Sequence, residues 1–566
     1  MKPFLRISIC VLAFALILSS CSKKNELGKM IPNNAMFVMH LNAKSLRQKL
    51  TWDDIKQTSW YQKAQADTSM KAWSKKILDN PENSGIDLDG DLVFFAVKNP
   101  GTDGQLILEG NVKNENDFAQ LNKHIDSTAT VKNDGDLKIL SLKDESVVAW
   151  NGKHFVYAFD QGAAKSKLNA MAPIGNQGTM APLVDRTETL SAVCKNLFNL
   201  KSDSSLAENK KFSTLLKENG DIHAWINTEQ IANSSSAMGM VGMMKLDVFL
   251  KDNISTYTVN FDNGKIDINQ KGYAGKEFSD FLEKYKGESV NADMIKNIPS
   301  QNLLGVFAMN FKPEGIKELI KLTGMDGFIN MYAQQAGFSI DDFVKANKGD
   351  IMLALTDLSM QNISTNPGDS TANYNFHKPD MKFIFSVAIG DKPSFQKLVE
   401  AGKKITNEMG KGEDTSIAYG QSDKVFAISN HQHFLNAYLA GNANSKYDFL
   451  DKLNGHPIGL FVDIHKILTS IAPEKQDNAD SKEIMDESLK LWNNVYVTAG
   501  DFKDGGVTGH TEVNFVDQNT NSLKQLNHYF DAIAKVEMAK KEREKSTTHN
   551  LDSLMMPPPM DTVGHK

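Results

Sequence analysis

The feature that most constrains this chain of 566 residues is a series of short segments that occurs twice in the same order. Each segment has the apolar pattern of a β-strand, or of a strand that leads into a helix. The matching pairs are residues 30–42 and 297–310, 90–97 and 349–356, 105–118 and 382–395, 154–160 and 424–430, 222–227 and 458–463, and 255–268 and 495–510. One pair would be weak evidence because strands resemble one another, but six pairs in register predict a tandem duplication.

The order of elements within each half predicts an α+β fold. Strands follow one another through short turns rich in Gly, Asn and Asp, which favours antiparallel pairing, and amphipathic helices lie between them. We therefore expect two tandem homologous repeats, residues 29–290 and 296–535, each a largely antiparallel sheet with packed helices, with a binding cleft at the seam between them. The polar insertion at 362–380 is predicted to be a loop, and residues 536–566 a charged helix and a disordered tail.

The N-terminus predicts a lipoprotein signal peptide. Two basic residues precede an apolar run at residues 7–18, which is too short to span a membrane comfortably. Small residues then lead into Cys21, as in the bacterial lipobox, where the cysteine thiol receives a diacylglyceryl group. We expect residues 1–20 to be removed, Cys21 to be lipidated and residues 21–28 to form a tether. An ordinary signal peptide or an uncleaved anchor is the alternative.

Composition limits the class of protein further. Hydrophobic residues make up 41% of the chain, which is enough for several packed domains, and the net charge of −6 leaves no overall basic field to bind nucleic acid. Once the leader is removed and Cys21 is lipidated, Cys194 is the remaining thiol, so no disulfide within the chain is expected. Cys194 has apolar neighbours at helical spacing, which predicts a core position rather than a reactive thiol.

Common local catalytic signatures are missing from the sequence: there is no G-x-S-x-G, H-E-x-x-H, P-loop or C-x-x-C. Ser394 and Lys397 form an S-x-x-K match, but its companion motifs are not present, and a serine in the first turn of a helix is typical of capping. His431 and His433 are two residues apart, so on a helix their rings point to different sides and could not share a metal ion.

Two further clusters have structural as well as functional interpretations. Asp87, Asp89 and Asp91 could attract calcium, but the EF-hand pattern fails and a turn before a strand explains them without an ion. The methionines within residues 238–244 favour packing or a protein contact, with membrane contact and Cu(I) binding as alternatives. The sequence therefore predicts no catalytic, cofactor-binding or metal-binding residue, and one modification site, the lipidation at Cys21.

Several of these features together resemble a known family. They are the I-P-x-x-A start at residues 31–35, the strand that ends at Asn42, the following residues 44–46, and the step at residues 84–87 before the strand that begins near Gly90. With the lipobox, they resemble an uncharacterised family of Bacteroidota lipoproteins filed as a domain of unknown function. The resemblance covers most of the mature chain and implies localisation and class only, because the family brings no established activity, cofactor or catalytic residue.

The expected function follows from the anchor and from the absence of catalytic motifs. Lys23 and Lys24 follow Cys21 where surface-exported lipoproteins of that group tend to carry acidic residues, so we expect an outer-membrane protein that faces the periplasm, with the cell surface as the alternative. We expect a non-enzymatic binding or structural protein with a protein, glycan or lipid partner. The alternative is a hydrolase of envelope polymers, which would need a deep pocket that gathers Ser, His and carboxylate groups from distant strands.

Overall fold

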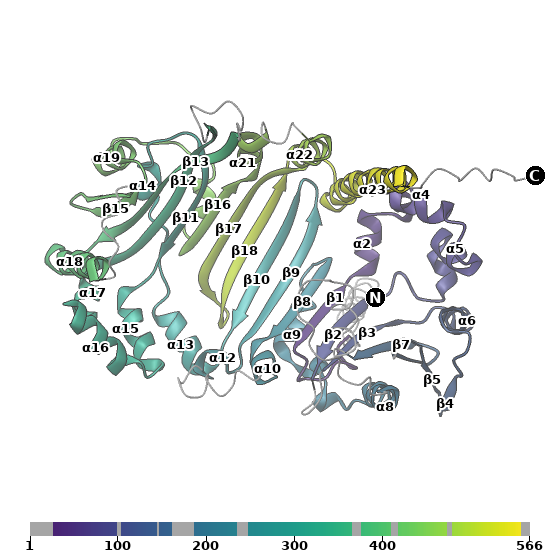
Figure 1. Cartoon of the computed structure of the whole chain (residues 1–566). Helices are drawn as coiled ribbons and strands as arrows, with labels where there is room; N and C mark the ends of the chain where they lie inside the picture. The colour runs from purple at the N-terminus through teal and green to yellow at the C-terminus, as the bar shows by residue number, and fades with distance from the viewer. Residues whose placement is uncertain are drawn as a thin grey trace, which may run out of the picture.

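The structure is a computed structural model that describes residues 27–98, 104–143, 146–160, 186–234, 247–364, 375–408, 417–472 and 478–555. Its centre is one antiparallel sheet that crosses the molecule, with helices along its edges and faces (Figure 1). Sheet and helices are mixed along the chain without a parallel βαβ arrangement among the described strands. The predicted α+β class with a largely antiparallel sheet is therefore confirmed.

The first half of the chain supplies one side of this sheet. Its strands lie in the order β10 (Lys265–Tyr273), β9 (Ile254–Asp262), β8 (Ile222–Asn227), β1 (Phe37–Leu41), β2 (Leu92–Val97), β3 (Gln105–Asn111), β7 (His154–Asp160), β6 (Val147–Trp150), β5 (Leu137–Ser141) and β4 (Lys132–Asp134). All of these neighbours pair antiparallel.

The second half supplies the other side in a matching order. Its strands are β18 (Gly506–Phe515), β17 (Trp492–Lys503), β16 (Ile458–Asp463), β11 (Leu303–Asn310), β12 (Asn347–Ser364), β13 (Asn375–Ile389), β15 (Val425–Ser429) and β14 (Ala418–Gln421). Registers match as well, since Phe37 lies opposite Ile226 in the β1–β8 pair and Gly305 lies opposite Val462 in the β11–β16 pair. Order and register support the proposed duplication, which stays a prediction.

The two halves meet edge to edge along β10 and β18. These strands pair antiparallel, from Lys265 opposite Asn514 to Gly272 opposite Val507. Antiparallel pairing of corresponding strands is the geometry of a twofold axis, as in an isologous dimer, and the two middle pairs are Ile268 opposite Thr511 and Asn269 opposite His510. The sheet edges therefore join through a row of backbone hydrogen bonds. The cleft expected between the halves stays a prediction, although a small pocket of about 160 Å³ lies where α23 (Ser522–Met555) meets α3 (Trp52–Lys56), between residues of both halves.

Corresponding connections carry the helices. Between β1 and β2 lie α2 (Ala43–Lys49), α3 (Trp52–Lys56), α4 (Ser59–Ala66) and α5 (Ala72–Asp79), and between β11 and β12 lie α15 (Pro313–Leu322), α16 (Asp326–Ala336) and α17 (Ile340–Ala346). Side-chain caps fix several starts: Thr51 with Asp54 and Ser339 with Asp342 form capping boxes at α3 and α17. These local signals determine where the helices begin.

Other helices follow the later strands of each half. In the first half, α6 (Glu115–Ile125) follows β3, α8 (Thr187–Phe198) and α9 (Lys210–Leu215) follow β7, and α10 (Thr228–Asn233) and α12 (Asp247–Leu250) follow β8. In the second half, α18 (Lys392–Glu408) follows β13, α19 (Gln432–Ala440) and α20 (Leu450–Leu453) follow β15, and α21 (Ile464–Ile471) and α22 (Ala479–Leu491) follow β16. The final hairpin of each half is followed by α13 (Lys276–Lys284) or by α23 (Ser522–Met555), and α14 (Ala292–Lys296) precedes β11.

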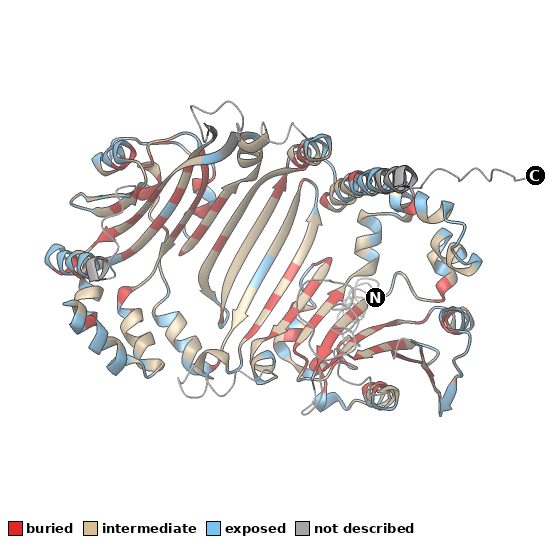
Figure 2. Ribbon diagram, viewed as in Figure 1, coloured by how far each residue is buried: buried red, intermediate tan, exposed pale blue. Residues whose placement is uncertain are grey.

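Each half has its own hydrophobic core (Figure 2). In the first half Trp225 and Phe212 meet edge to face with ring centroids 5.7 Å apart, and in the second half Phe449 and Phe461 stack at 4.2 Å. The central strands β9, β10, β17 and β18 are mostly half-buried instead. The two cores therefore lie on either side of the seam.

Two predicted segments differ from the structure. The loop predicted at residues 362–380 is shorter, because β12 continues to Ser364 and β13 begins at Asn375, with Ile363 opposite Phe376. Main-chain hydrogen bonds hold these polar strand ends together. Residues 365–374 lie outside the described part of the chain. The boundary proposed between residues 535 and 536 falls inside α23, which is continuous from Ser522 to Met555. Among the described helices, none combines the length and apolar character that a membrane crossing requires.

Candidate functional site

An apolar groove lies on the helices of the second half, with a cavity volume of about 670 Å³. It is formed where the three helices between β11 and β12 meet α18. The side chains that line it include Ile316 and Ile320 of α15, Phe328 and Tyr332 of α16, Phe343 of α17 and Lys404 of α18. The groove therefore has an almost wholly apolar floor and one cation at its edge.

The aromatic side chains of α16 leave the groove open on one side. Phe328 is 57% exposed and Tyr332 is 54% exposed, and their rings lie 4.7 Å apart along one face of the helix. Figure 2 shows exposed positions along α16. Large aromatic residues this exposed, clustered beside a cavity, are typical of an interaction site rather than of ordinary surface.

Ion pairs hold the walls of the groove in place. Lys317 of α15 contacts Asp341 of α17 at 2.6 Å, and Lys397 of α18 contacts Asp342 of α17 at 2.8 Å. The Lys397 ammonium, together with the hydrogen bonds from Ser339, lowers the pKa of Asp342 to about 2. These contacts tie α17 to α15 on one side and to α18 on the other.

The corresponding helices of the first half contact a later helix of the chain. There α23 lies against α4 (Figure 1), and the carboxylate of Asp531 accepts hydrogen bonds from the backbone N–H and the hydroxyl of Ser59 at 2.7 and 2.6 Å. Lys524 of α23 also pairs with Asp54 of α3 at 3.0 Å. The helix that follows the last hairpin of the second half therefore packs on the helices of the first half.

The counterpart of α23 is much shorter. α13 has nine residues, and Tyr285 just after it packs so tightly on α15 that a Cβ at Gly315 would lie 2.9 Å from the Tyr285 Cβ. The chain then turns away at Gly287, where a Cβ would lie 1.9 Å from the carbonyl oxygen of Asn310. This helix therefore reaches α15 but ends before it could cover α16.

A buried polar cluster occupies the sheet of the first half. The Nδ1 atoms of His40 and His223 lie 3.0 Å apart, His40 Nε2 is 3.0 Å from an oxygen of Asp91, and His223 Nε2 is 3.1 Å from the carbonyl oxygen of Glu218. Burial, with the neighbouring His40, lowers the pKa of His223. The two rings are 6% and 3% exposed, so they are closed off from any polymer substrate.

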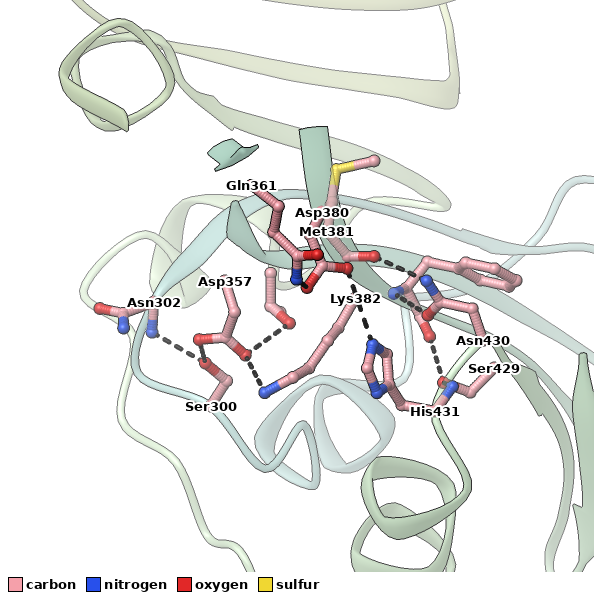
Figure 3. A network of polar contacts seen from close by, with 12 residues as sticks. Ser300, Asn302, Asp357, Gln361, Asp380, Met381, Lys382, Ser429, Asn430 and His431 are labelled. Carbon is pink, nitrogen blue, oxygen red and sulfur yellow. Dashed lines mark hydrogen bonds and ion pairs between the residues drawn. The ribbon is translucent and has the colours of Figure 1, made fainter. Parts of the chain in front are cut away.

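A second polar network pins the bulge of β12 in the second half (Figure 3). Asp357 has φ of 55°, and its carboxylate accepts a hydrogen bond from Ser300 at 2.9 Å and lies 3.4 Å from the Lys382 ammonium. His431 is the N-cap of α19 and its Nε2 lies 3.9 Å from Asp380. The contacts of Asp357 lie at the register shift of β12, and the ion-pair partner of the His431 ring is Asp380 rather than His433.

The S-x-x-K match does not form a catalytic dyad. The Ser394 hydroxyl donates to the carboxylate of Asp391 at 2.6 Å, and Lys397 pairs with Asp342 as described above. Asp391 also accepts from the Ser394 backbone N–H, so it caps α18 and Ser394 is part of the cap. The serine of this motif therefore belongs to a helix cap, whereas its lysine forms an ion pair with another helix.

The aspartates considered for calcium have separate protein partners. Asp89 pairs with Arg47 at 2.8 Å, Asp91 contacts His40, and Asp87 accepts a hydrogen bond from the Asp89 backbone N–H at 3.2 Å. A calcium ion needs several oxygens directed at one point. The structure supports the interpretation of this segment as a turn that leads into β2.

A cluster that the sequence analysis missed lies at the seam. Ligand atoms of Asp267, His510 and Glu512 are within 4.8 Å of one another, the grouping that a divalent cation would need. Lys265 lies 3.2 Å from Asp267 and Lys452 lies 2.7 Å from Glu512, so two ammonium groups already balance the two carboxylates. We interpret the cluster as a salt-bridge network across the β10–β18 pair.

Cys194 is fully buried in α8, and burial raises the pKa of its thiol to about 12. The predicted core position is confirmed, and a thiol with so high a pKa is chemically inert near neutral pH. Cys21 and the methionines at 238–244 lie outside the described residues. Their predicted roles stay predictions.

Residues 179–426 match the model of a protein family described as "Domain of unknown function (DUF4836)". The match contains the groove, from α15 to α18, and runs from the later part of the first half to the earlier part of the second. No curated protein and no solved structure matches the chain significantly. The similarity therefore supports a family of unknown function.

Proposed function

We propose that this chain is a cell-envelope lipoprotein, anchored by lipidated Cys21 at the outer membrane and facing the periplasm, that acts by binding rather than by catalysis. The leader at residues 1–20 and the small residues before Cys21 support the anchor. The open apolar groove on α15 to α18 carries the binding proposal, because ligand sites are concave, largely apolar and preformed.

The enzyme alternative has less support. His40, His223 and Asp91 are the described groups closest to a catalytic cluster, and both rings are closed inside the sheet. A general base must reach a proton of its substrate within hydrogen-bond distance. The Ser394 hydroxyl, the other candidate group, donates to Asp391. We therefore assign the His pair to the core of the first half.

The anchor is tested by metabolic labelling of cells with an alkyne fatty acid. Wild type should carry the label and stay in the membrane fraction, whereas Cys21→Ala should lose both, because the thiol is the acceptor of the lipid. Cys194→Ala is the matched control and should keep both. Label and membrane association that persist in Cys21→Ala would contradict the anchor.

The binding role is tested with the apolar dye ANS on the mature protein. Wild type should enhance the dye fluorescence, and the double substitution Phe328→Asp with Tyr332→Asp should remove more than half of that enhancement because it charges the groove. The control is Trp60→Asp, which changes an exposed aromatic residue of α4 in the first half. Equal fluorescence from all three proteins would show that the groove does not bind apolar ligands.

A further inference from the structure

We propose that the groove binds one amphipathic α-helix of a protein partner, in the position where α23 would lie if the second half were covered as the first half is. The inference rests on the proposed binding function and names the class of ligand. It is carried by the comparison between the two helix layers, by the spacing of the lining side chains and by the open side of the groove.

The first step is the covering helix. Each final hairpin sends its following helix to the helix layer of the other half: α23 contacts α3 and α4 through Lys524 and Asp531, and the end of α13 contacts α15 through Tyr285. α23 continues for 34 residues, whereas α13 stops after nine. Beyond the length that α13 has, Glu542 of α23 still pairs with Lys63 of α4 at 3.5 Å. The helices of the first half therefore have a long helix of this chain beside them, and the corresponding place in the second half has none among the described residues.

The second step is the spacing of the lining side chains. Ile316 and Ile320 are one helical turn apart on α15, and Phe328 and Tyr332 are one turn apart on α16. Such pairs form ridges into which the ridges of another helix pack. The eleven residues of α16 extend for about 16 Å, which is room for three turns of a bound helix.

The third step separates a helix from an acyl chain. An acyl chain is stabilised when apolar walls surround it, but Phe328 and Tyr332 are more than half exposed and leave one side of the groove in water. A helix of about 10 Å diameter can cover both rings while its polar face remains solvated.

The experiment is a selection from a displayed library of peptides of about 18 residues, with a fixed helix-forming polar face and a varied apolar face. The bait is the mature protein. Selected peptides should bind it saturably one to one, and Phe328→Ala with Tyr332→Ala should weaken binding about tenfold or more. Trp60→Ala is the matched control and should not change the affinity. Circular dichroism of each variant confirms that it is folded.

Three outcomes would overturn the proposal. Selected peptides that bind wild type and the groove variant equally would place the helix elsewhere. If the library yields no groove-dependent peptide and palmitate binds the groove, the groove is a site for acyl chains. If the protein dimerises with increasing concentration and the groove variant does not, the groove binds a second copy of the chain. Equal ANS fluorescence from wild type, the groove variant and the Trp60 control would instead defeat the proposed function itself, so the two failures are distinguishable.

Discussion

The two halves of the molecule share a strand order and register but differ in what covers their helices. In the first half α23 packs against α3 and α4, through Lys524 and Asp531. In the second half α13 ends early and the groove on α15 to α18 stays open. The comparison teaches that the sheet fixes where helices attach, whereas the helix after each final hairpin differs between the halves in its length and in the contacts it makes.

The halves also differ inside the sheet. At three matching positions the first half buries titratable side chains where the second half buries small residues. The matching pairs are His40 and Ala308, His223 and Gly459, and Glu109 and Ser386. Buried titratable groups make stability depend on pH, whereas small side chains do not. We therefore expect the first half to be the pH-sensitive one.

The largest expected effect concerns the aromatic side chain that docks the helix after the third strand of each half. Phe118→Ala should cost about 3–5 kcal/mol of unfolding free energy, because this fully buried ring packs on Trp150 and Phe155. Phe395→Ala should cost less, since that ring contacts Phe426 alone among the described aromatic rings and is slightly exposed. Denaturant unfolding of both variants measures the difference; a larger loss from Phe395→Ala would reverse this ranking.

A smaller effect is expected from Glu109, whose pKa burial raises to about 7 from 4.5. Between these values the folded protein holds a proton that the unfolded chain has lost, so stability falls as pH rises through this window. Glu109→Gln should therefore stabilise the protein by about 2–3 kcal/mol near pH 8 and change little near pH 4. Thermal unfolding across this range measures the effect.

The matched substitution in the second half sharpens this test. Ser386 is fully buried and its hydroxyl lies 2.8 Å from that of Tyr438, so Ser386→Ala should destabilise by about 1 kcal/mol at every pH. A pH-independent effect of Glu109→Gln would show that this carboxyl is ionised to the same extent in the folded and unfolded states.

A third effect is expected from the histidine pair. Burial lowers the pKa of His223. Below about pH 6.5 the unfolded chain therefore binds a proton at this histidine that the folded protein does not bind, and the stability of the fold decreases as the solution becomes more acidic. The double substitution His40→Ala with His223→Gly introduces the residues found at the matching positions of the second half, and it should remove this loss of stability at acidic pH. His40→Ala alone should cost about 1–3 kcal/mol because it leaves a buried nitrogen of His223 without its partner.

The measurement is best made with Glu109→Gln as the background, because Glu109 acts in the opposite direction over the same range of pH. Between pH 5 and pH 7, the thermal stability of the Glu109→Gln protein should decrease as the pH falls. The stability of the protein that also carries His40→Ala and His223→Gly should stay constant over this range. A loss of stability at acidic pH that persists would assign it to other groups.

Much of the framework could be predicted from the sequence because its signals are local. Strand patterns recur in order, and Ile222 and Ile458 indeed begin the corresponding strands β8 and β16. Phe118 and Phe395 lie in α6 and α18, the helices expected from the strand-to-helix transitions. Alternating and helical periodicities report each element independently of its distant partners.

The surfaces and contacts between distant segments could not be predicted. The pairing of β10 with β18 brings Asp267 to His510 across 243 positions, and no local pattern encodes which strand edge will meet which. The groove was missed because Phe328 and Tyr332 have the spacing of an ordinary core-facing helix. Whether such a face is buried depends on the length of the covering helix elsewhere in the chain.

The most direct test of this comparison is amide hydrogen exchange on the mature protein and on Lys524→Ala with Asp531→Ala, which removes two polar contacts of α23 with α3 and α4. Exchange in α3 and α4 should become about tenfold faster, because their local stability depends on α23, while exchange in α15 and α16 stays unchanged. Unchanged exchange in α3 and α4, or an equal increase in α16, would contradict the claim that α23 covers one half and leaves the groove of the other open.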